Sequence, residues 1–270
     1  VHDRHQFSLI KLCEKTSRAI ASKAEPKTLR QIEKLEGVEE HLVREAMLDE
    51  VKWMIEHNKC VPRDKRTLPN DINEIDGKWV IKYKKTLENM LERVRARWVL
   101  RGDTQIPEVD FNPRDIYSPV ASKSATLTIL SFAVQFGLQL YCIDVSKAFT
   151  VSDIEPGVYM SVPKGFNDKT HPDFNPYGQH TTWELLTTLY GLKQASAKYY
   201  HTFATALLAY TDDNGLKFRR SDHDPCVFTK GTLGSDSYIT LSIHIDDKFI
   251  ACTSERELLE FKSILDKANA

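Results

Sequence analysis

Residues 242–252 read SIHIDDKFIAC and place two adjacent carboxylates, Asp246 and Asp247, inside an otherwise apolar, strand-like run. Burying either charge without a partner costs free energy, so the pair needs a physical reason. One reason is a hairpin turn, because aspartate is common in turns. The other is a metal site. The run itself predicts two antiparallel strands that meet at the aspartates, and both reasons remain open at this point.

The whole chain has the composition of an ordinary globular protein. Its 270 residues suffice for one large domain or two subdomains, and 41% are hydrophobic and 28% charged. No apolar run reaches the roughly 18 residues that a membrane span needs. The five cysteines are scattered and form no CxxC pair. This argues against a disulfide framework or a zinc site, and for a reducing intracellular compartment such as the cytoplasm or nucleus.

The N-terminal residues 1–24 carry five basic and two acidic side chains. Two interpretations stay open for them: the remnant of an amphipathic targeting region, which would place the protein in an organelle, and a plain N-terminal helix.

A basic segment stands out in a chain whose net charge is only −1. Between Lys78 and Arg101 there are eight basic residues against two acidic ones, Glu88 and Glu92. Such a segment is an electrostatic footprint for a polyanion or the solvated face of a two-stranded ribbon, and charge alone does not decide between them.

The hydrophobic periodicity predicts an α+β fold. Helices are expected at 37–58, 122–137, 193–210 and 254–267. Strands are expected at 78–85, 93–102, 138–144, 158–163, 181–191, 224–230, 237–245 and 248–253, with 138–144 buried. Loops are expected at 59–77 and 103–119. Helices and antiparallel strands are interleaved without a regular βαβ rhythm, which favours α+β over a doubly wound sheet.

A third carboxylate, Asp144, closes the apolar strand LYCID at 140–144. If that strand lies beside the hairpin, Asp144 and Asp246 converge on one point. Close carboxylates resist ionisation unless a cation compensates them. Magnesium takes oxygen ligands, and two such ions about 3.5–4 Å apart would hold the attacking and leaving oxygens of a phosphoryl transfer.

Three phrases carry a family resemblance: IDVSKAF at 143–149, YGLKQA at 190–195 and HIDD at 244–247. In order and approximate spacing they resemble DVKTAF, LYGLKQS and YVDD in reverse transcriptases of Ty1/copia-type retrotransposons. Further similar phrases are KWVIKYK, ARWVLRGDTQ, YSPVAS, VYMSVPKGF and SDHDPCVF. The resemblance covers roughly residues 42 to 266.

The resemblance implies a right-hand polymerase fold of fingers and palm, with an antiparallel palm sheet backed by helices. It divides the chain into an N-terminal extension at 1–41, a fingers-like subdomain at 42–118 and a palm-like subdomain at 119–270. Nothing in the sequence matches the thumb or the RNase H domain of the family, so these are expected to be absent from the chain.

The resemblance also implies catalytic roles. Asp144 and Asp246 would be the catalytic, metal-binding carboxylates, and Asp247 their less direct companion in the same metal site. The implied cofactor is Mg²⁺, as two ions, with Mn²⁺ as the alternative ion.

Four further residues gain implied roles in substrate binding. Phe149 matches the position where an aromatic ring blocks a ribose 2′-OH, although core packing explains it equally well without the resemblance. Gln194 would lie along the template and the incoming base. Arg97 and Lys82 would contact the triphosphate, with a surface strand position as the alternative for Arg97.

The sequence departs from the family pattern at two places. His244 stands where an aromatic residue such as tyrosine is usual, and TVSD at 150–153 replaces a phrase like LNGD. A lone histidine is more often structural than catalytic, so His244 is assigned no proton-transfer role.

Two functions therefore remain as hypotheses. In the first, the chain is an RNA-directed DNA polymerase domain, with an RNA template, a DNA primer and deoxynucleoside triphosphates as partners and a thumb supplied elsewhere. In the second, it is a retrotransposon-derived, catalytically retired domain that serves as a structural or RNA-associated subunit among other proteins of a larger complex.

Overall fold

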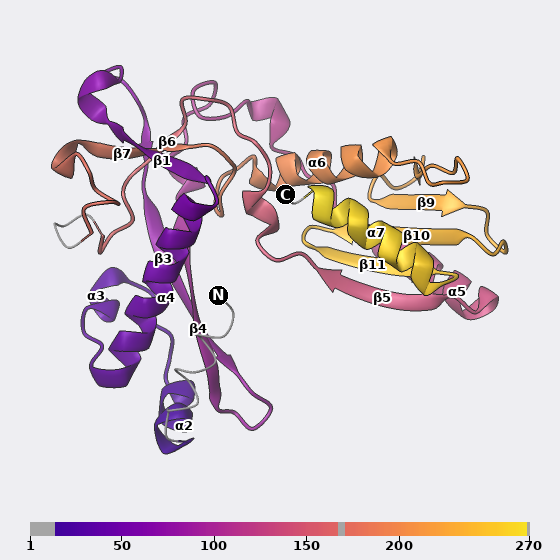
Figure 1. The fold of residues 1–270 in the computed structure, drawn as a ribbon, viewed down its shortest axis with the longest axis horizontal. Coiled ribbons are helices and arrows are strands. Elements are labelled where there is room, and N and C mark those ends of the chain that lie inside the picture. Colours follow the sequence, from indigo (N-terminus) through magenta and orange to yellow (C-terminus); the bar gives the residue numbers. More distant parts are fainter. Residues whose placement is uncertain (1–13, 167–170, 269–270) are drawn as a thin grey trace. The chain divides into compact units, whose positions relative to one another are not determined.

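The computed structural model describes residues 14–166 and 171–268, which form two compact units (Figure 1). The first unit takes its described residues from the chain up to Asp110 and from Ile154–Leu192. The second comprises Phe111–Asp153 and the chain from Lys193 onward. Residues 154–192, which fall inside the predicted palm-like range, belong to the first unit because their strands pair with strands of that unit.

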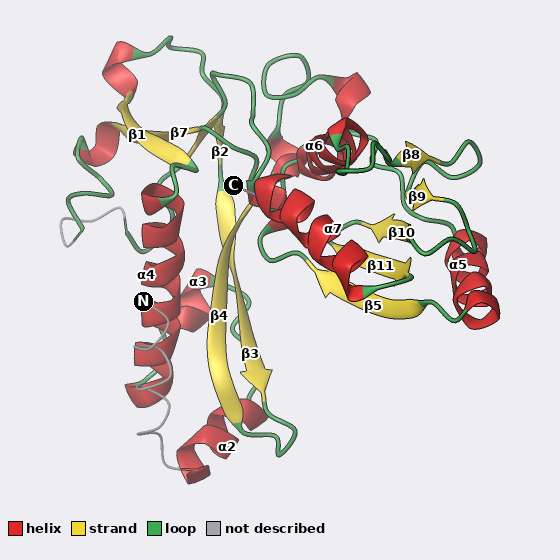
Figure 2. Cartoon of the chain, turned by 45° about the vertical axis from the view of Figure 1, so that its right-hand side comes forward, coloured by secondary structure: helices red, strands yellow, loops and turns green. Residues whose placement is uncertain are grey.

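The first unit begins with helices and a long β-hairpin. The helices are α2 (Glu14–Ser22), α3 (Leu29–Ile32) and α4 (Gly37–Glu56), and the hairpin is β3 (Gly77–Lys85) with β4 (Leu91–Leu100). Figure 2 shows α4 running alongside this hairpin, and it packs on β4. The hairpin and α4 confirm the predicted elements at 37–58, 78–85 and 93–102. Of the N-terminal segment 1–24, residues 1–13 lie outside the described residues, and α2 shows that residues 14–22 are helical, which agrees with both interpretations.

Side chains of the β3–β4 hairpin alternate between a buried and an exposed face. In β3 the buried side chains are Trp79, Ile81 and Tyr83. The lysines at the alternate positions 82 and 84 are exposed. The two-residue period of a strand therefore turns the lysines of β3 away from the core.

A second sheet of the first unit corrects one prediction. Its strand order is β1-β7-β6-β2, from β1 (Cys60–Asp64), β7 (Thr181–Leu185), β6 (Tyr159–Met160) and β2 (Glu74–Ile75). The prediction of a loop over residues 59–77 was wrong, because β1 and β2 lie there. Pro62 and the polar composition conceal β1, which is an edge strand formed by pairing with β7 more than a hundred residues away. Proline is tolerated on such an edge.

The second unit is a five-stranded sheet with helices on both faces. The strand order is β5-β11-β10-β9-β8, and all pairs are antiparallel. Its strands are β5 (Gln139–Asp144), β8 (Arg219–Arg220), β9 (Val227–Gly231), β10 (Tyr238–His244) and β11 (Asp247–Cys252), and its helices are α5 (Lys123–Phe136), α6 (Ala195–Ala209) and α7 (Glu255–Ala268). Short 3-10 helices occur in this unit at Pro113–Asp115 and Ala148–Thr150 (η4), and in the first unit at Lys65–Thr67, Gly102–Thr104 and Gly178–His180. The mixed α/β architecture with mainly antiparallel sheets agrees with the predicted class.

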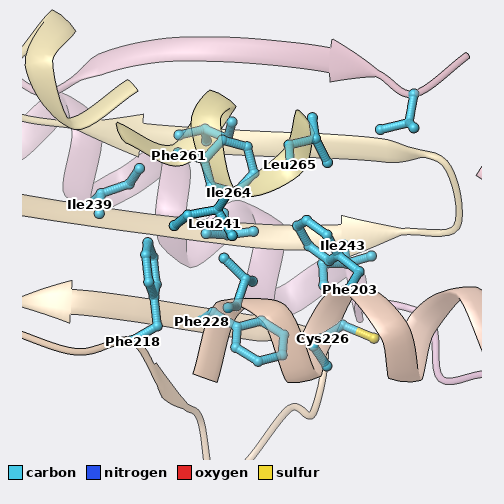
Figure 3. Close-up of a cluster of buried hydrophobic side chains, with 14 of the residues drawn as sticks. Phe203, Phe218, Cys226, Phe228, Ile239, Leu241, Ile243, Phe261, Ile264 and Leu265 are labelled. Carbon is cyan, nitrogen blue, oxygen red and sulfur yellow. The ribbon is translucent and has the colours of Figure 1, made fainter. Parts of the chain in front are cut away.

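The main core of the second unit lies between the sheet and helices α6 and α7 (Figures 1 and 3). Alternate residues of β10 point into it and meet Phe203 of α6 and Phe261 of α7, whose rings pack edge to face at 6.0 Å. Fully burying a side chain of this size stabilises the fold by about 1.5–3 kcal/mol. The β10 residues that enter this core are Ile239, Leu241 and Ile243.

The opposite face of the sheet is covered less completely. Ile129 and Ala133 of α5 pack against Tyr238 and Ala251. The prediction that 138–144 is a buried strand was wrong, because β5 is an edge strand and its Leu140 is 43% exposed. No helix within the described residues is long and apolar enough to cross a membrane.

Candidate active site

The turn between β10 and β11 contains only two residues. His244 and Asp247 face each other as the last pair of the ladder, which leaves Ile245 and Asp246 in the turn. Ile245 has φ of 59°. Two-residue hairpins that need a positive φ at the first turn position usually have glycine there, and a β-branched residue in this region is an outlier. The turn is therefore strained, and its surroundings must hold it in place.

The neighbouring strand brings Asp144 to the same end of the sheet. Asp144 lies directly opposite Asp247 in the β5–β11 pairing, and the N–H of Val145 donates to the carbonyl oxygen of Asp246 at 3.2 Å. Opposite residues of antiparallel strands have Cα atoms about 4.5–5.5 Å apart, which applies to Asp144 and Asp247. The Cα atom of Asp246 lies one residue further along the chain, about 3.8 Å from that of Asp247. The backbone thus places the Cα atoms of all three aspartates within roughly 10 Å of one another. The strand that ends at Asp144 does lie beside the hairpin, which is the condition under which Asp144 and Asp246 were expected to converge.

The exposure and donor chemistry of the three aspartates suit a hard divalent cation. Asp144 and Asp247 are exposed and Asp246 is half-buried. Their side chains offer only carboxylate oxygens, which are the ligands that Mg²⁺ prefers. Across residues 14–166 and 171–268, no three His, Cys, Asp or Glu side chains stand in an arrangement that could hold a metal ion. The donor chemistry and the backbone positions of the three aspartates suit Mg²⁺, but the described side chains are not gathered around one common ion position.

A buried lysine, which was not among the site residues predicted from the sequence, lies behind the turn. Lys248 is 1% exposed, and its ammonium donates to the carbonyl oxygens of Ile245 at 3.0 Å and Asp246 at 3.1 Å. Burial lowers its pKa to about 8 against the opposing charges of Asp246, Asp247 and Asp144. The carboxylates are therefore close enough for all three to act on this one ammonium group. The sequence does contain a signal for this buried lysine. In the alternating pattern of the strand, Lys248 is on the same side as the apolar residues Ile250 and Cys252, which is the side expected to face the core.

Two aromatic side chains of helix α6 contact the ammonium group of this lysine. The ammonium of Lys248 lies 4.9 Å from the ring centre of Tyr199 and 5.1 Å from that of Phe203. Burial, together with the charges of Asp246 and Asp144, raises the pKa of the Tyr199 phenol. Tyr199 is thus buried beneath the lysine, where the charges of two of the aspartates act on its phenol.

The predicted sugar-selecting residue, Phe149, belongs to the same unit. It lies in η4, directly after the segment that follows β5, and is half-buried. Its ring meets that of Tyr199 edge to face at 6.4 Å. This contact is the packing alternative raised from sequence, and it links Phe149 to the aromatic residue beneath Lys248.

Gln194 and His244 occupy contrasting positions in the second unit. Gln194 immediately precedes α6 and is 1% exposed, so the contact with template and base implied for it stays a prediction. His244 is exposed at the end of β10, opposite Asp247.

The two predicted triphosphate ligands lie in the first unit. Arg97 is on β4, opposite Val80, with its guanidinium 4.9 Å from the ring centre of Tyr190. Lys82 on β3 forms an ion pair with Glu25 at 2.8 Å. Each charge already has a partner within its unit, and the implied contact with a triphosphate stays a prediction.

Comparison with known proteins gives this site its family. The family model described as "Reverse transcriptase (RNA-dependent DNA polymerase)" matches residues 64–269, which include β5, the aspartate hairpin and all of α7. The chain therefore belongs to the reverse transcriptase family.

The similar proteins define the branch of that family. The chain is 29% identical over 253 residues to the retrovirus-related Pol polyprotein from transposon TNT 1-94 of Nicotiana tabacum. This aligned region covers 92% of the chain and 17% of that polyprotein. The chain is 28% identical to the corresponding polyproteins from transposons RE2 and RE1 of Arabidopsis thaliana, over 86% and 92% of the chain and 14% and 15% of their lengths. The chain thus spans about a sixth of these relatives. It is a reverse transcriptase domain of the Ty1/copia type, as the sequence resemblance predicted.

Proposed function

We propose that this domain catalyses RNA-directed DNA synthesis, in which a DNA primer is extended with deoxynucleotides on an RNA template. One observation carries the proposal: Asp144 lies directly opposite Asp247, with Asp246 in the adjoining turn, in a chain that belongs to the reverse transcriptase family. Phosphoryl transfer asks for positioning and charge stabilisation rather than covalent chemistry, and a fixed group of carboxylates serves both.

In this proposal Asp144 and Asp246 hold the metal ions, and Asp247 supports them from the opposite strand. When bound, two Mg²⁺ ions, or Mn²⁺ in their place, would neutralise the phosphate charge and activate the primer hydroxyl. The contribution of the chain is to fix the carboxylates at the end of β5, in the turn and at the start of β11, where Asp144 and Asp247 are exposed and Asp246 is half-buried.

Residues around the aspartates would select and orient the substrates. Phe149, supported by the ring of Tyr199, would exclude a ribose 2′-OH. Gln194 would act on the template side, through its position at the start of α6.

The two units would correspond to fingers and palm. The β3–β4 hairpin, with its exposed lysines, would be the fingers element and contact phosphates through Arg97 and Lys82. The sheet with the aspartates would be the palm. Contacts of basic side chains with phosphates supply most of the sequence-independent affinity for nucleic acids, which is the role that the basic segment would fill.

Primer extension tests the proposal. The purified chain, alone and fused to the segment that follows the matching region in the Nicotiana relative, is given a primed RNA template, deoxynucleotides and MgCl₂. Extension by the wild type and its loss in Asp246→Asn are expected. Equal extension by both would refute the assigned site. The alternative of a retired structural subunit has no support from the comparisons or from the described residues.

A further inference from the structure

The ammonium group of Lys248 occupies an unusual place for a charge. It is 1% exposed on the face of β11 that enters the main core, among Ile250, Tyr199 and Phe203. Burying an ammonium costs free energy unless hydrogen bonds replace its water. The structure gives it two backbone carbonyl oxygens and two aromatic faces.

Those two carbonyl oxygens belong to the two residues of the strained turn. Lys248 donates to Ile245, which has φ of 59°, and to Asp246, the residue that follows it. One side chain thus fixes the orientation of two of the three peptide groups in the turn, those that follow Ile245 and Asp246. Without it, a β-branched residue at this position has reason to relax toward negative φ, which would rotate Asp246.

The same carbonyl oxygen connects the turn to the third aspartate. The Asp246 oxygen accepts from Lys248 and also from the N–H of Val145, the residue next to Asp144. A rotation of the Asp246 peptide would therefore break the link between the hairpin and the end of β5. The positions of Asp144 and Asp246 depend on one another through this shared acceptor.

We infer that Lys248 is a positioning residue: its buried ammonium clamps the β10–β11 turn so that Asp144, Asp246 and Asp247 are held together before any metal ion or substrate binds. The inference rests on the proposed function for its catalytic consequence, but the clamp itself is a property of the metal-free protein. Lys248 touches no reacting atom in this account and acts only through the turn.

A second buried lysine provides the matched control. Lys230 on β9 is also 1% exposed in the same sheet, but its partners are Asp212, Glu257 and Glu260. Lys230→Met removes a buried charge of the same kind without touching the turn. It should lower the stability of the second unit and leave the aspartates in register.

The test compares Lys248→Met with Lys230→Met by amide hydrogen exchange and kinetics. In metal-free protein, exchange of the Val145 amide, relative to amides in the middle of β10, should rise about tenfold or more in Lys248→Met and stay within about twofold in Lys230→Met, because only the first opens the turn locally. Well below the melting temperature, Lys248→Met should lower kcat about tenfold or more with little change in the KM for deoxynucleotide, as misplacement of catalytic groups does.

A double variant separates the clamp from general stability. Glycine adopts a positive φ freely, so Ile245→Gly removes the strain that Lys248 is inferred to restrain. In that background, Lys248→Met should change Val145 exchange by only about twofold, which would be a clear departure from additivity. The double variant also keeps the test available if Lys248→Met alone does not fold.

Unchanged Val145 exchange in Lys248→Met, or strictly additive effects with Ile245→Gly, would overturn the inference. If the wild type extends no primer in any format, the proposed function fails, while the exchange measurements still decide the clamp.

Discussion

Lys230→Met should destabilise the second unit strongly, and by an amount that depends on pH. The Lys230 ammonium lies 2.8 Å from Glu260, 2.9 Å from Glu257 and 3.1 Å from Asp212. The exposed fractions of these side chains are 1% for Lys230, 3% for Asp212, 5% for Glu257 and 20% for Glu260. Methionine fills a similar volume but leaves three carboxylates without their shared cation.

Removing one partner of a buried ion pair typically costs about 3–5 kcal/mol, against a total stability of about 5–15 kcal/mol for a folded protein. The second unit, Phe111–Asp153 with Lys193–Ala270, lies between the domain sizes for which each kcal/mol lowers the melting temperature by about 4–8 °C and by about 2–4 °C, so about 4 °C per kcal/mol and a fall of about 12–20 °C are expected. The same change at Lys262, an exposed lysine of α7, is the control and should alter stability by less than about 0.5 kcal/mol.

The pH dependence follows from the carboxylates. Burial raises the pKa of Asp212 and of Glu260, but hydrogen bonds outweigh it and hold both pKa values below their usual range, Lys230 being a donor to each. Groups with a lowered pKa contribute stability that is present above their unfolded pKa and lost as pH falls through the folded value. In Lys230→Met these acids keep the burial and lose the cation, so the destabilisation should be largest at pH 7.

Near pH 4, where unfolded aspartate and glutamate take up protons, the difference between wild type and variant should shrink. Urea denaturation at pH 7 and pH 4 measures it. A loss below about 1 kcal/mol at pH 7, or an equal loss at both pH values, would refute the reasoning, because a buried cation that holds three carboxylates cannot be removed at so little cost.

Three further predictions concern single positions. Phe149→Ala should leave extension with deoxynucleotides partly intact and admit ribonucleotides, measured by primer extension with each; no gain of ribonucleotide use would contradict the sugar-excluding role. Asp144→Asn should preserve the free energy of unfolding of the metal-free protein or raise it by up to about 1 kcal/mol, because it removes a like charge directly opposite Asp247; a clear loss of stability in thermal melts would show that the carboxylate is structural. Gly191→Ala should destabilise the first unit by more than about 1 kcal/mol in thermal melts, since Gly191 has φ of 93° and an added Cβ would overlap the carbonyl oxygen of Leu100; wild-type stability would contradict this.

Much of the fold was predictable because local patterns and packing agree. The two-residue period that puts Trp79, Ile81 and Tyr83 on one face is visible in the sequence, as is the spacing of Tyr199 and Phe203 along α6. In each case the apolar side of the pattern is the side that the structure buries.

The errors have one physical origin, which is pairing over long distances. Nothing near Pro62 indicates a strand, because β1 exists only through its pairing with β7. The apolar run at β5 indicates burial, but its place at the edge of the sheet leaves Leu140 exposed. Sheet order is a property of the whole chain, so local composition does not reveal which strand becomes the edge.

The three aspartates of the candidate site could be predicted from the sequence, but the residues that hold them in place could not. Asp144, Asp246 and Asp247 follow from apolar strands that end in carboxylates, together with the family resemblance. The positive φ of Ile245 and the clamp by Lys248 do not follow, because they depend on the geometry of a two-residue turn and on the aromatic side chains of α6 beneath it.

Metal-dependent primer extension decides whether the three aspartates form a polymerase active site. Wild type and Asp246→Asn are compared on a primed RNA template with deoxynucleotides, with MgCl₂ and with EDTA, after melting curves have shown that both are folded. Extension is expected only by the wild type and only with the metal ion. Extension by Asp246→Asn at the wild-type rate, or extension by the wild type in EDTA, would contradict this expectation.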